Sequence, residues 1–217
     1  MVLSLKIDKK EVLRYLGYGT KSADDNINKI IDECIEILKN NAREDYIYEI
    51  FDASLEENVI IDDGLTFLGN DIKKHLVNCE KVAILGATLG REVDVLLRRY
   101  AKNEASKAII LHACATALIE GVCDNAEGEI KKKASENGYY ITTRYSPGYG
   151  DLPLEHQTQI INMLKCDKKI GLTVTENFLL VPSKSVTAII GFTKQQPECK
   201  KGCKFCSNYS TCKFKKE

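Results

Sequence analysis

The sequence predicts an α+β fold with a mainly antiparallel sheet flanked by helices, followed by a short cysteine-rich tail. Strand-like apolar runs and long helical segments both occur, but without the regular βαβ order that produces a doubly wound parallel sheet. The chain has 217 residues, of which 44% are hydrophobic, and this is enough for a large buried core. Composition changes at Gln195–Pro197, so we expect one domain over residues 1–193 and a tail over 194–217.

Apolar periodicity predicts the helices. Between residues 22 and 43, apolar side chains recur at three- and four-residue steps, and Ser22 with Asp25 forms a variant capping box at the start. A long alanine-rich helix is predicted over residues 104–133, where small side chains permit close packing against a neighbour. Shorter helices are expected at 70–78, around Val93–Tyr100 and at 154–164.

Strand signals occupy most of the remaining apolar segments. Residues 58–68 predict a β-hairpin with Asp63-Gly64 at its turn. Lys81–Leu85 predicts a buried strand, and the following Gly86–Gly90 is either a tight turn, which we favour, or an anion-binding loop. Its spacing matches neither the dinucleotide-binding nor the P-loop motif. Further strands are expected at 139–144, 171–175, 178–181 and 185–192.

Charge and hydropathy narrow the classes of function. Lys plus Arg and Asp plus Glu each number 31, and this balance argues against a general nucleic-acid binder, which needs excess positive charge. The longest apolar stretch, Ala108–Ile119, is shorter than the roughly 20 residues that span a bilayer. The first residues lack the long apolar segment of a signal peptide. We therefore expect a cytoplasmic protein that binds neither nucleic acid nor membrane.

The most unusual segment runs from Arg144 to Pro153 and holds two of the four prolines. Pro147-Gly148 is a turn pair, and Gly148 lets a ligand approach the backbone closely. Arg144 can hold a carboxylate through two parallel hydrogen bonds. Tyr149 can stack, donate a hydrogen bond or face a sulfonium cation. The segment indicates either a site for a small zwitterionic ligand or an ordinary strand-to-helix turn with a solvent-facing arginine.

This segment resembles the signature of the activation domain of cobalamin-dependent methionine synthase. The similar run is RYSPGYGDLPLEH, beginning at Arg144, in which Arg, a small residue, Pro-Gly-Tyr and a nearby Pro follow a strand. Leu172–Pro182 followed by Lys184–Thr187 is similar to the closing hairpin of that family, and Leu118–Gly121 gives a third match. Together the three matches cover roughly residues 105–193.

The resemblance implies a C-shaped domain around a bent antiparallel sheet, with S-adenosylmethionine in a shallow groove. Arg144 would hold the carboxylate of the ligand, and Ser146 and Gly148 would provide main-chain contacts. Tyr149 would lie near the reactive sulfonium as the candidate catalytic residue. Glu120 would pair with the amino group of the ligand, the alternative being a surface carboxylate on a long helix.

The sequence departs from the large form of the family in two ways. It contains no Trp, so it lacks the N-terminal Asp-Trp segment whose Asp also touches the ligand in that form. Asp62, Asp63 or another acid could take this role. The spacing from Glu120 to Arg144 is also shorter than in the large form, which implies a trimmed groove.

The resemblance also implies a reaction and its partners. In this family, an electron from a flavodoxin- or ferredoxin-like donor and a methyl group from S-adenosylmethionine convert inactive cob(II)alamin to methylcobalamin. Reduced cobalt is the nucleophile, so no general base is needed. A length of 217 residues leaves no room for folate, homocysteine or cobalamin domains. We therefore expect a free-standing module that acts on a separate methionine synthase lacking its own activation domain.

The three histidines are dispersed in sequence, which argues against a three-histidine metal site. His112 is expected in the core of the long helix. His156 is expected at the rim of the ligand groove at most, and His75 has no assigned role.

The nine cysteines fall into two groups. Four form the cluster C-x3-C-x2-C-x5-C near the end of the chain, which predicts a Zn²⁺ or iron–sulfur site, with unligated thiols as the alternative. An iron–sulfur cluster would relay an electron to cobalt, whereas Zn²⁺ would fold the tail. Five others lie in apolar contexts and are expected to be free thiols. The cluster consists of Cys199, Cys203, Cys206 and Cys212, and the other five are Cys34, Cys79, Cys114, Cys123 and Cys166.

Two other classes of function remain open. One is a reductive activator of another corrinoid protein that uses an iron–sulfur cluster in the tail as an electron relay. The other is a non-enzymatic, zinc-tailed interaction protein that does not bind S-adenosylmethionine. From Lys194 onward the tail has seven Lys and two Glu, so it is either a solvated end or a docking segment for an acidic partner.

Overall fold

The computed structural model describes residues 7–19, 21–55, 59–61 and 65–196. These residues form an α+β fold around a six-stranded sheet with the strand order β3-β2-β1-β4-β8-β5. All strand pairs in the described residues are antiparallel, as predicted. The sheet strands are β1 (Asp45–Leu55), β2 (Val59–Ile61), β3 (Leu65–Phe67), β4 (Cys79–Thr88), β5 (Tyr140–Ile141) and β8 (Ser185–Thr193), and β6 (Thr173–Val174) pairs separately with β7 (Leu180–Val181).

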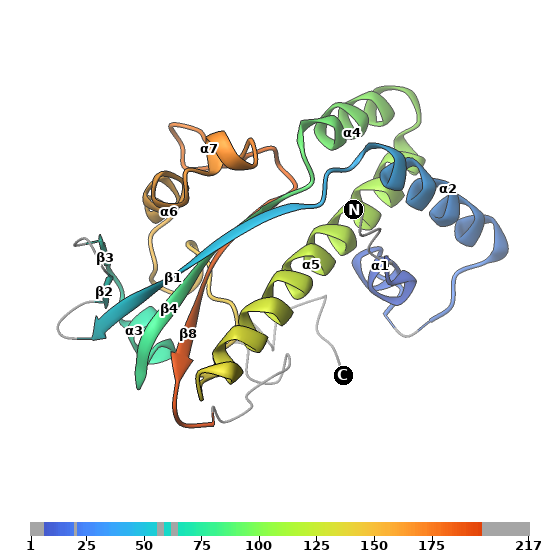
Figure 1. The fold of residues 1–217 in the computed structure, drawn as a ribbon. Coiled ribbons are helices and arrows are strands. Elements are labelled where there is room, and N and C mark those ends of the chain that lie inside the picture. Colours follow the sequence, from blue (N-terminus) through green and yellow to red (C-terminus); the bar gives the residue numbers. More distant parts are fainter. Residues whose placement is uncertain (1–6, 20, 56–58, 62–64, 197–217) are drawn as a thin grey trace.

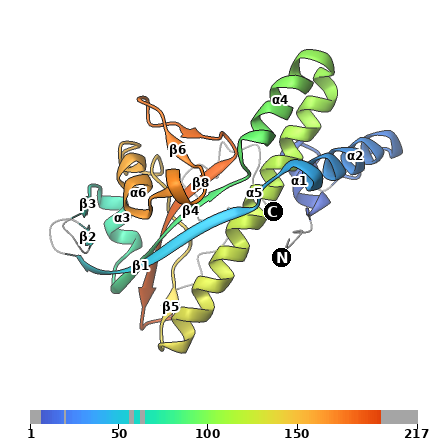
Figure 2. The same cartoon turned by 45° about the horizontal axis from the view of Figure 1, so that its top comes forward.

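Helices cover both faces of the long strands β1, β4 and β8 (Figure 1). The longest helix crosses one face, and two short helices lie over the other. Three of the remaining helices gather at the end where β4 leaves the sheet and pack against the long helix (Figure 2). The helices are α1 (Lys9–Tyr15), α2 (Asp25–Asn41), α3 (Asn70–His75), α4 (Arg91–Asn103), α5 (Ala105–Glu136), α6 (His156–Leu164) and α7 (Cys166–Lys169).

The sheet is buried on both faces because alternate residues of a strand point to opposite sides. On β4, Val82 and Ile84 pack with residues of α6 and α7. Ala83 and Leu85 pack with residues of α5 on the opposite face. Ala126 and Ala134 of α5 are buried in these contacts, and Ala113, Ala115 and Ala117 are buried nearer the start of the helix, in agreement with the prediction that small side chains allow it to pack closely.

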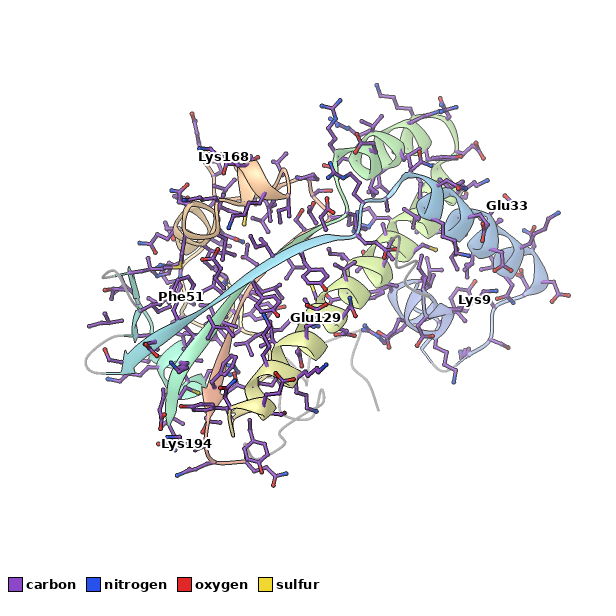
Figure 3. The ribbon with its side chains drawn as sticks, viewed as in Figure 1. Lys9, Glu33, Phe51, Glu129, Lys168 and Lys194 are labelled. Carbon is purple, nitrogen blue, oxygen red and sulfur yellow. The ribbon has the colours of Figure 1, made fainter. Side chains whose placement is uncertain are left out.

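Strand β1 is the principal element that the sequence analysis did not predict. It pairs with β4 over eight residues, from Asp45 opposite Thr88 to Asp52 opposite Lys81. Polar residues occur on both faces of this strand, and most of its side chains are only half buried. One of its polar side chains contacts the long helix: Tyr46 Oη donates a hydrogen bond at 2.5 Å to Oε1 of Glu129 on α5, which is labelled in Figure 3.

A turn or loop was predicted over Gly86–Gly90. The prediction is wrong for residues 86–88, because β4 continues to Thr88. Gly86 is required inside the strand: a Cβ atom built there would lie 2.9 Å from Cys166 Sγ. Only Leu89 and Gly90 turn the chain towards α4, and Gly90 N donates to Thr88 Oγ1 at 3.2 Å. This segment is therefore a strand end that packs closely against α7, and it offers no anion-binding loop.

The start of α2 also differs from the prediction. Asp24 caps this helix through a 2.8 Å hydrogen bond from Ile27 N, and the helix begins at Asp25. The expected Ser22–Asp25 capping box is therefore wrong. A carboxylate at the N-cap position satisfies a free backbone N–H in the same way as a serine hydroxyl, so Asp24 takes the role that was expected of Ser22.

A β-hairpin was predicted over residues 58–68, and its two strands are confirmed as β2 and β3. Val59 lies opposite Phe67, and Ile61 lies opposite Leu65. Its turn at residues 62–64, which includes the candidate ligand acids Asp62 and Asp63, lies outside the described residues.

The strand predicted over residues 139–144 is short. Only Tyr140 and Ile141 pair regularly with β8. The chain then leaves the ladder and rejoins it at Tyr145, which exchanges two hydrogen bonds with Ile189 at 2.8 and 2.9 Å. Arg144 is the last residue before this bridge, so the interrupted ladder fixes its backbone next to β8.

Helix α5 is long and apolar enough, by length and composition alone, to cross a membrane. However, 61% of its most apolar window is buried inside the fold. It is packed here as the core helix of the domain.

Candidate functional site

A cavity of about 530 Å³ lies where α5, the segment after β5, and β8 meet. Four of the five predicted ligand-contacting residues line it, namely Glu120, Arg144, Ser146 and Tyr149. Gly148, the fifth, belongs to the adjoining turn and is not a lining residue. The other lining residues are Asp124, Glu127, Thr143, Gln157, Leu180, Ser185, Val186 and Thr187. The volume falls within the range of about 300–1,000 Å³ that is usual for small-molecule sites.

Arg144 is surrounded by three carboxylates of α5. Its Nη1 donates to Asp124 Oδ1 at 2.8 Å and lies 3.1 Å from Glu127 Oε2, while Nη2 donates to Glu120 Oε2 at 3.1 Å. These acids can reach one guanidinium because residues three and four apart lie on the same helix face. The contacts leave the Nε–H of Arg144 without a carboxylate among the described residues.

The electrostatics of this cluster favour a charged arginine and leave an excess of negative charge. Burial works against the guanidinium charge, but the hydrogen bond that Arg144 donates to Asp124 and the charges of the nearby acids outweigh it, so the pKa of Arg144 is raised. One cation faces three carboxylates, which gives the cavity a surplus of two negative charges. Such a cavity complements a ligand that carries more positive than negative charge.

The turn after Arg144 is built by Pro147 and Gly148. Tyr149 N donates to Ser146 O at 3.1 Å, and Gly148 has φ of +92°, which is the geometry of a type II turn with Pro and Gly at its centre. A Cβ atom at Gly148 would lie 3.0 Å from Leu154 Cδ2. The observed role of Gly148 is therefore to shape the turn that presents Ser146 and Tyr149.

Helix α3 holds both ends of this segment. Asp151 accepts hydrogen bonds from Asn70 N at 2.7 Å and Asp71 N at 2.9 Å, and these bonds lower its pKa. At the other end, His75 Nε2 donates to Thr143 O at 2.8 Å. Asp151 thus acts as a helix cap supplied by a distant part of the chain, a role that the sequence analysis did not foresee.

Comparisons with known proteins identify the family and support the fold. The profile of the family described as "Vitamin B12 dependent methionine synthase, activation domain" matches residues 65–200, well over half of the chain. The chain belongs to this family. The activation-domain match begins about 40 residues before the region of roughly 105–193 that the sequence analysis assigned to the family, so it also covers α3, β4 and α4.

A solved activation domain has the same fold. The structure titled "Crystal Structure of the MetH Reactivation Domain bound to AdoHcy" matches with a TM-score of 0.63 and 16% sequence identity. The match covers 81% of this chain and 66% of the other, so this chain spans just under two thirds of that domain. No curated protein matches the sequence.

Three residues of the activation-domain motif line the cavity, namely Arg144, Ser146 and Tyr149. Tyr149 is the most exposed of them, with 60% of its surface accessible. Its ring meets the ring of Tyr145 edge to face at 6.1 Å, and its carbonyl accepts a hydrogen bond from Tyr145 Oη at 3.2 Å. The side chain is held at the mouth of the cavity, where an aromatic face can contact a ligand cation.

The sequence analysis missed several polar lining residues of this activation domain. Gln157 Oε1 accepts a hydrogen bond from Thr187 Oγ1 at 2.6 Å, and both residues are buried. The spacing of Glu120, Asp124 and Glu127 places three acids on one helix face and could have been recognised. No sequence signal pairs Gln157 with Thr187, because α6 and β8 come together only in the folded chain.

Two histidine predictions are wrong. His156 is buried beneath the motif, where its Nε2 accepts from Leu68 N at 3.2 Å and its ring packs against Phe67 at 5.1 Å. It is a core residue and does not lie at the rim of the groove. His112, expected in the helix core, is exposed on α5.

In the part of the chain that the structure describes, no three His, Cys, Asp or Glu side chains gather as a metal site. The four tail cysteines, Cys199, Cys203, Cys206 and Cys212, lie outside the described residues. The five other cysteines are buried free thiols, as predicted.

Proposed function

We propose that this chain binds S-adenosylmethionine in the Arg144 cavity and supports reductive methylation of cob(II)alamin on a separate methionine synthase. The observation that carries this proposal is the charge pattern of the cavity, with one arginine among three carboxylates. The methionine part of the ligand has one carboxylate and two cations, an ammonium and a sulfonium. A cavity with one cation and three anions complements that set.

The free edge of Arg144 is the proposed carboxylate site. The Nε–H and the second Nη2–H lie on the same side of the guanidinium and can hold a carboxylate bidentately. The three acids of α5 can remain in place while this edge is used, because their contacts are with Nη1 and, through one acceptor only, with Nη2, and none is with Nε. Arg144 therefore binds the ligand without first leaving Glu120.

The positive groups of the ligand would face α5 and Tyr149. We assign Glu120 to the ammonium and the exposed ring of Tyr149 to the sulfonium, whose charge favours the face of an aromatic ring. Ser146 presents main-chain groups at the mouth of the cavity, and Gly148 sets the turn. In this assignment Tyr149 orients the methyl group of the sulfonium, whose positive charge is already present before the reaction.

The methyl acceptor would come from the partner protein. Cobalamin supplies a nucleophilic cobalt once a flavodoxin- or ferredoxin-like donor has reduced it, so this chain needs no general base. Its residues position the donor and leave the sulfonium accessible from the mouth at Tyr149. We further propose that the domain is C-shaped around its bent sheet, which would let a cobalamin-carrying domain dock over this mouth.

The buried thiols support a reducing compartment, which we propose to be the cytoplasm. Burial raises the pKa of the Cys79 and Cys166 thiols to about 11. These thiols therefore stay protonated at neutral pH and are poor nucleophiles.

The test is calorimetric titration of the purified chain with S-adenosylmethionine, with and without a cobalamin-loaded methionine synthase that lacks its activation domain. We expect saturable binding, and recovery of synthase activity when a reduced flavodoxin is added. S-adenosylhomocysteine, which lacks the sulfonium charge, is expected to bind more weakly because the surplus carboxylates then have one cation fewer. No binding in either condition would contradict the proposal.

A further inference from the structure

A second cavity of about 550 Å³ lies between the end of α1, the outer part of α4 and the first half of α5. Its walls are almost entirely apolar, and Ile109 at its edge is exposed to solvent despite its size. It shares no lining residue with the Arg144 cavity. The apolar walls include Tyr15, Leu16, Leu97, Ala105, Ala108 and Ile109.

The polar end of this cavity adjoins a buried lysine. Lys184, just before β8, is 8% exposed, and its Nζ donates to Thr116 Oγ1 at 2.7 Å and to His112 Nδ1 at 3.1 Å. His112 and Thr116 are themselves lining residues of the cavity. The ammonium group therefore borders the end of an apolar cavity through two neutral side chains.

Lys184 lacks a carboxylate partner in the described part of the chain. Asp94 of α4 attracts the Lys184 charge, but its two oxygens accept hydrogen bonds from Ser183 N at 2.9 Å and Ser183 Oγ at 2.6 Å. Burial lowers the pKa of Lys184 to about 8 despite the attraction of Asp94. An ammonium has three donors, and only two of them have acceptors here.

A buried charge without a counter-ion is costly, so such groups are normally paired. An apolar cavity with a few placed polar groups at one end is the usual form of a small-molecule site. We propose that this cavity binds an aliphatic monocarboxylate, with its carboxylate at the end formed by His112 and Thr116, next to the Lys184 ammonium, and its chain along α4 and α5. The carboxylate would act as the counter-ion of Lys184, and the alkyl chain would cover Ile109.

The lining selects this ligand class over others. A nucleotide or sugar would leave many polar groups without partners against Leu97 and the alanines of α5. A neutral lipid would fill the apolar part but would leave the Lys184 ammonium unpaired. A short acid such as acetate would pair the charge but would bury little apolar surface.

The experiment is calorimetric titration of the full chain at pH 7 with octanoate, octan-1-ol and acetate. We expect saturable octanoate binding that is at least tenfold weaker in Lys184→Met. Octan-1-ol is expected to bind wild type and Lys184→Met alike, because it makes no use of the charge. Acetate is expected to bind at least tenfold more weakly than octanoate.

A second variant tests the apolar part independently. Ala108→Phe places a ring in the cavity and leaves Lys184 unchanged, so octanoate binding should fall at least tenfold while S-adenosylmethionine binding is retained. Circular dichroism and the melting temperature establish that each variant is folded. Absence of octanoate binding to wild type, or equal octanoate binding by wild type and both variants, would overturn the inference.

Discussion

Arg144 joins two parts of the molecule that are far apart in the sequence. Its guanidinium binds three acids of α5, and its backbone precedes the bridge that attaches Tyr145 to β8. With the side chain only 20% exposed, these ion pairs are screened less than surface pairs. The residue therefore positions the motif against α5 even before any ligand binds.

Replacing Arg144 with Ala should weaken S-adenosylmethionine binding by about 2–4 kcal/mol, because the ligand carboxylate loses a desolvated, charge-assisted partner. Calorimetry measures the change, and thermal melting checks that the variant is folded. Arg91→Ala, on the exposed start of α4, is the matched control and should bind normally. Arg144→Lys should be intermediate, since it keeps the charge and loses the bidentate edge. Wild-type affinity in a folded Arg144→Ala variant would contradict the site.

Lys184 should make stability depend on pH in the alkaline range. Its folded pKa of about 8 lies below its ordinary value of 10.5, so the unfolded chain binds more protons between these values and stability rises as pH increases. Relative to Lys184→Met, wild type should gain on the order of 3 kcal/mol between pH 7 and 10.5.

Urea denaturation of both proteins at several pH values measures this difference. His112 accepts a hydrogen bond from Lys184, and because its pKa is lowered from 6.5, it does not change charge in that range. A difference in the free energy of unfolding that stays constant with pH would show that Lys184 is not desolvated.

Individual elements were predictable where one periodicity dominated. The alanine-rich α5, the β2–β3 hairpin and β8 follow from apolar patterns that the tertiary structure reinforces. Strand β1 was not predicted because its residues are half-buried and polar on both faces. The strand at residues 139–144 was overestimated because its pairing with β8 is interrupted after Ile141, and a gap in pairing leaves no sequence signature.

The element most sensitive to a single change should be α3, which is capped by Asp151 from another segment. Asp151→Ala removes the acceptor for Asn70 N and Asp71 N, so it should lower the melting temperature and loosen the motif at Tyr149. Because the pKa of Asp151 is lowered by these bonds, the stabilisation exists above its unfolded value and is lost as pH falls through the lower folded value.

Amide hydrogen exchange on residues 70–76 and 145–152, compared with wild type, tests this role. Asp167→Ala, on the short helix α7, provides a surface-acid control. Unchanged protection of both segments in Asp151→Ala would show that the cap is dispensable.

Across the whole molecule, the sequence predicted several residues that line the Arg144 cavity but little of what surrounds them. Glu120, Arg144, Ser146 and Tyr149 came together as expected because the motif carries its own turn chemistry. Gln157 and Thr187 were missed because their contact depends on how α6 packs over β8. The buried positions of His156 and Lys184 likewise depend on packing between distant segments, which no local pattern encodes.

We also predict that the cysteine-rich tail, residues 194–217, binds a metal. Four cysteines with the spacing of Cys199, Cys203, Cys206 and Cys212 should hold one Zn²⁺ or one iron–sulfur cluster. Metal analysis and the absorption spectrum of anaerobically purified protein distinguish Zn²⁺ from an iron–sulfur cluster. Cys203→Ser with Cys206→Ser should remove the metal, whereas Cys34→Ser should retain it. Metal-free wild type would leave the tail with unligated thiols.

The double attachment of the motif to α3 has a thermodynamic consequence. At the start of the segment, Thr143 is held by a hydrogen bond from His75 of α3. At its other end, Asp151 is held by hydrogen bonds from the first two residues of α3. A ligand that binds as proposed would therefore meet a preorganised loop, and little conformational entropy would be lost on binding. Association should be fast and nearly independent of loop motion, so differences in affinity between ligands should appear mainly in their dissociation rates.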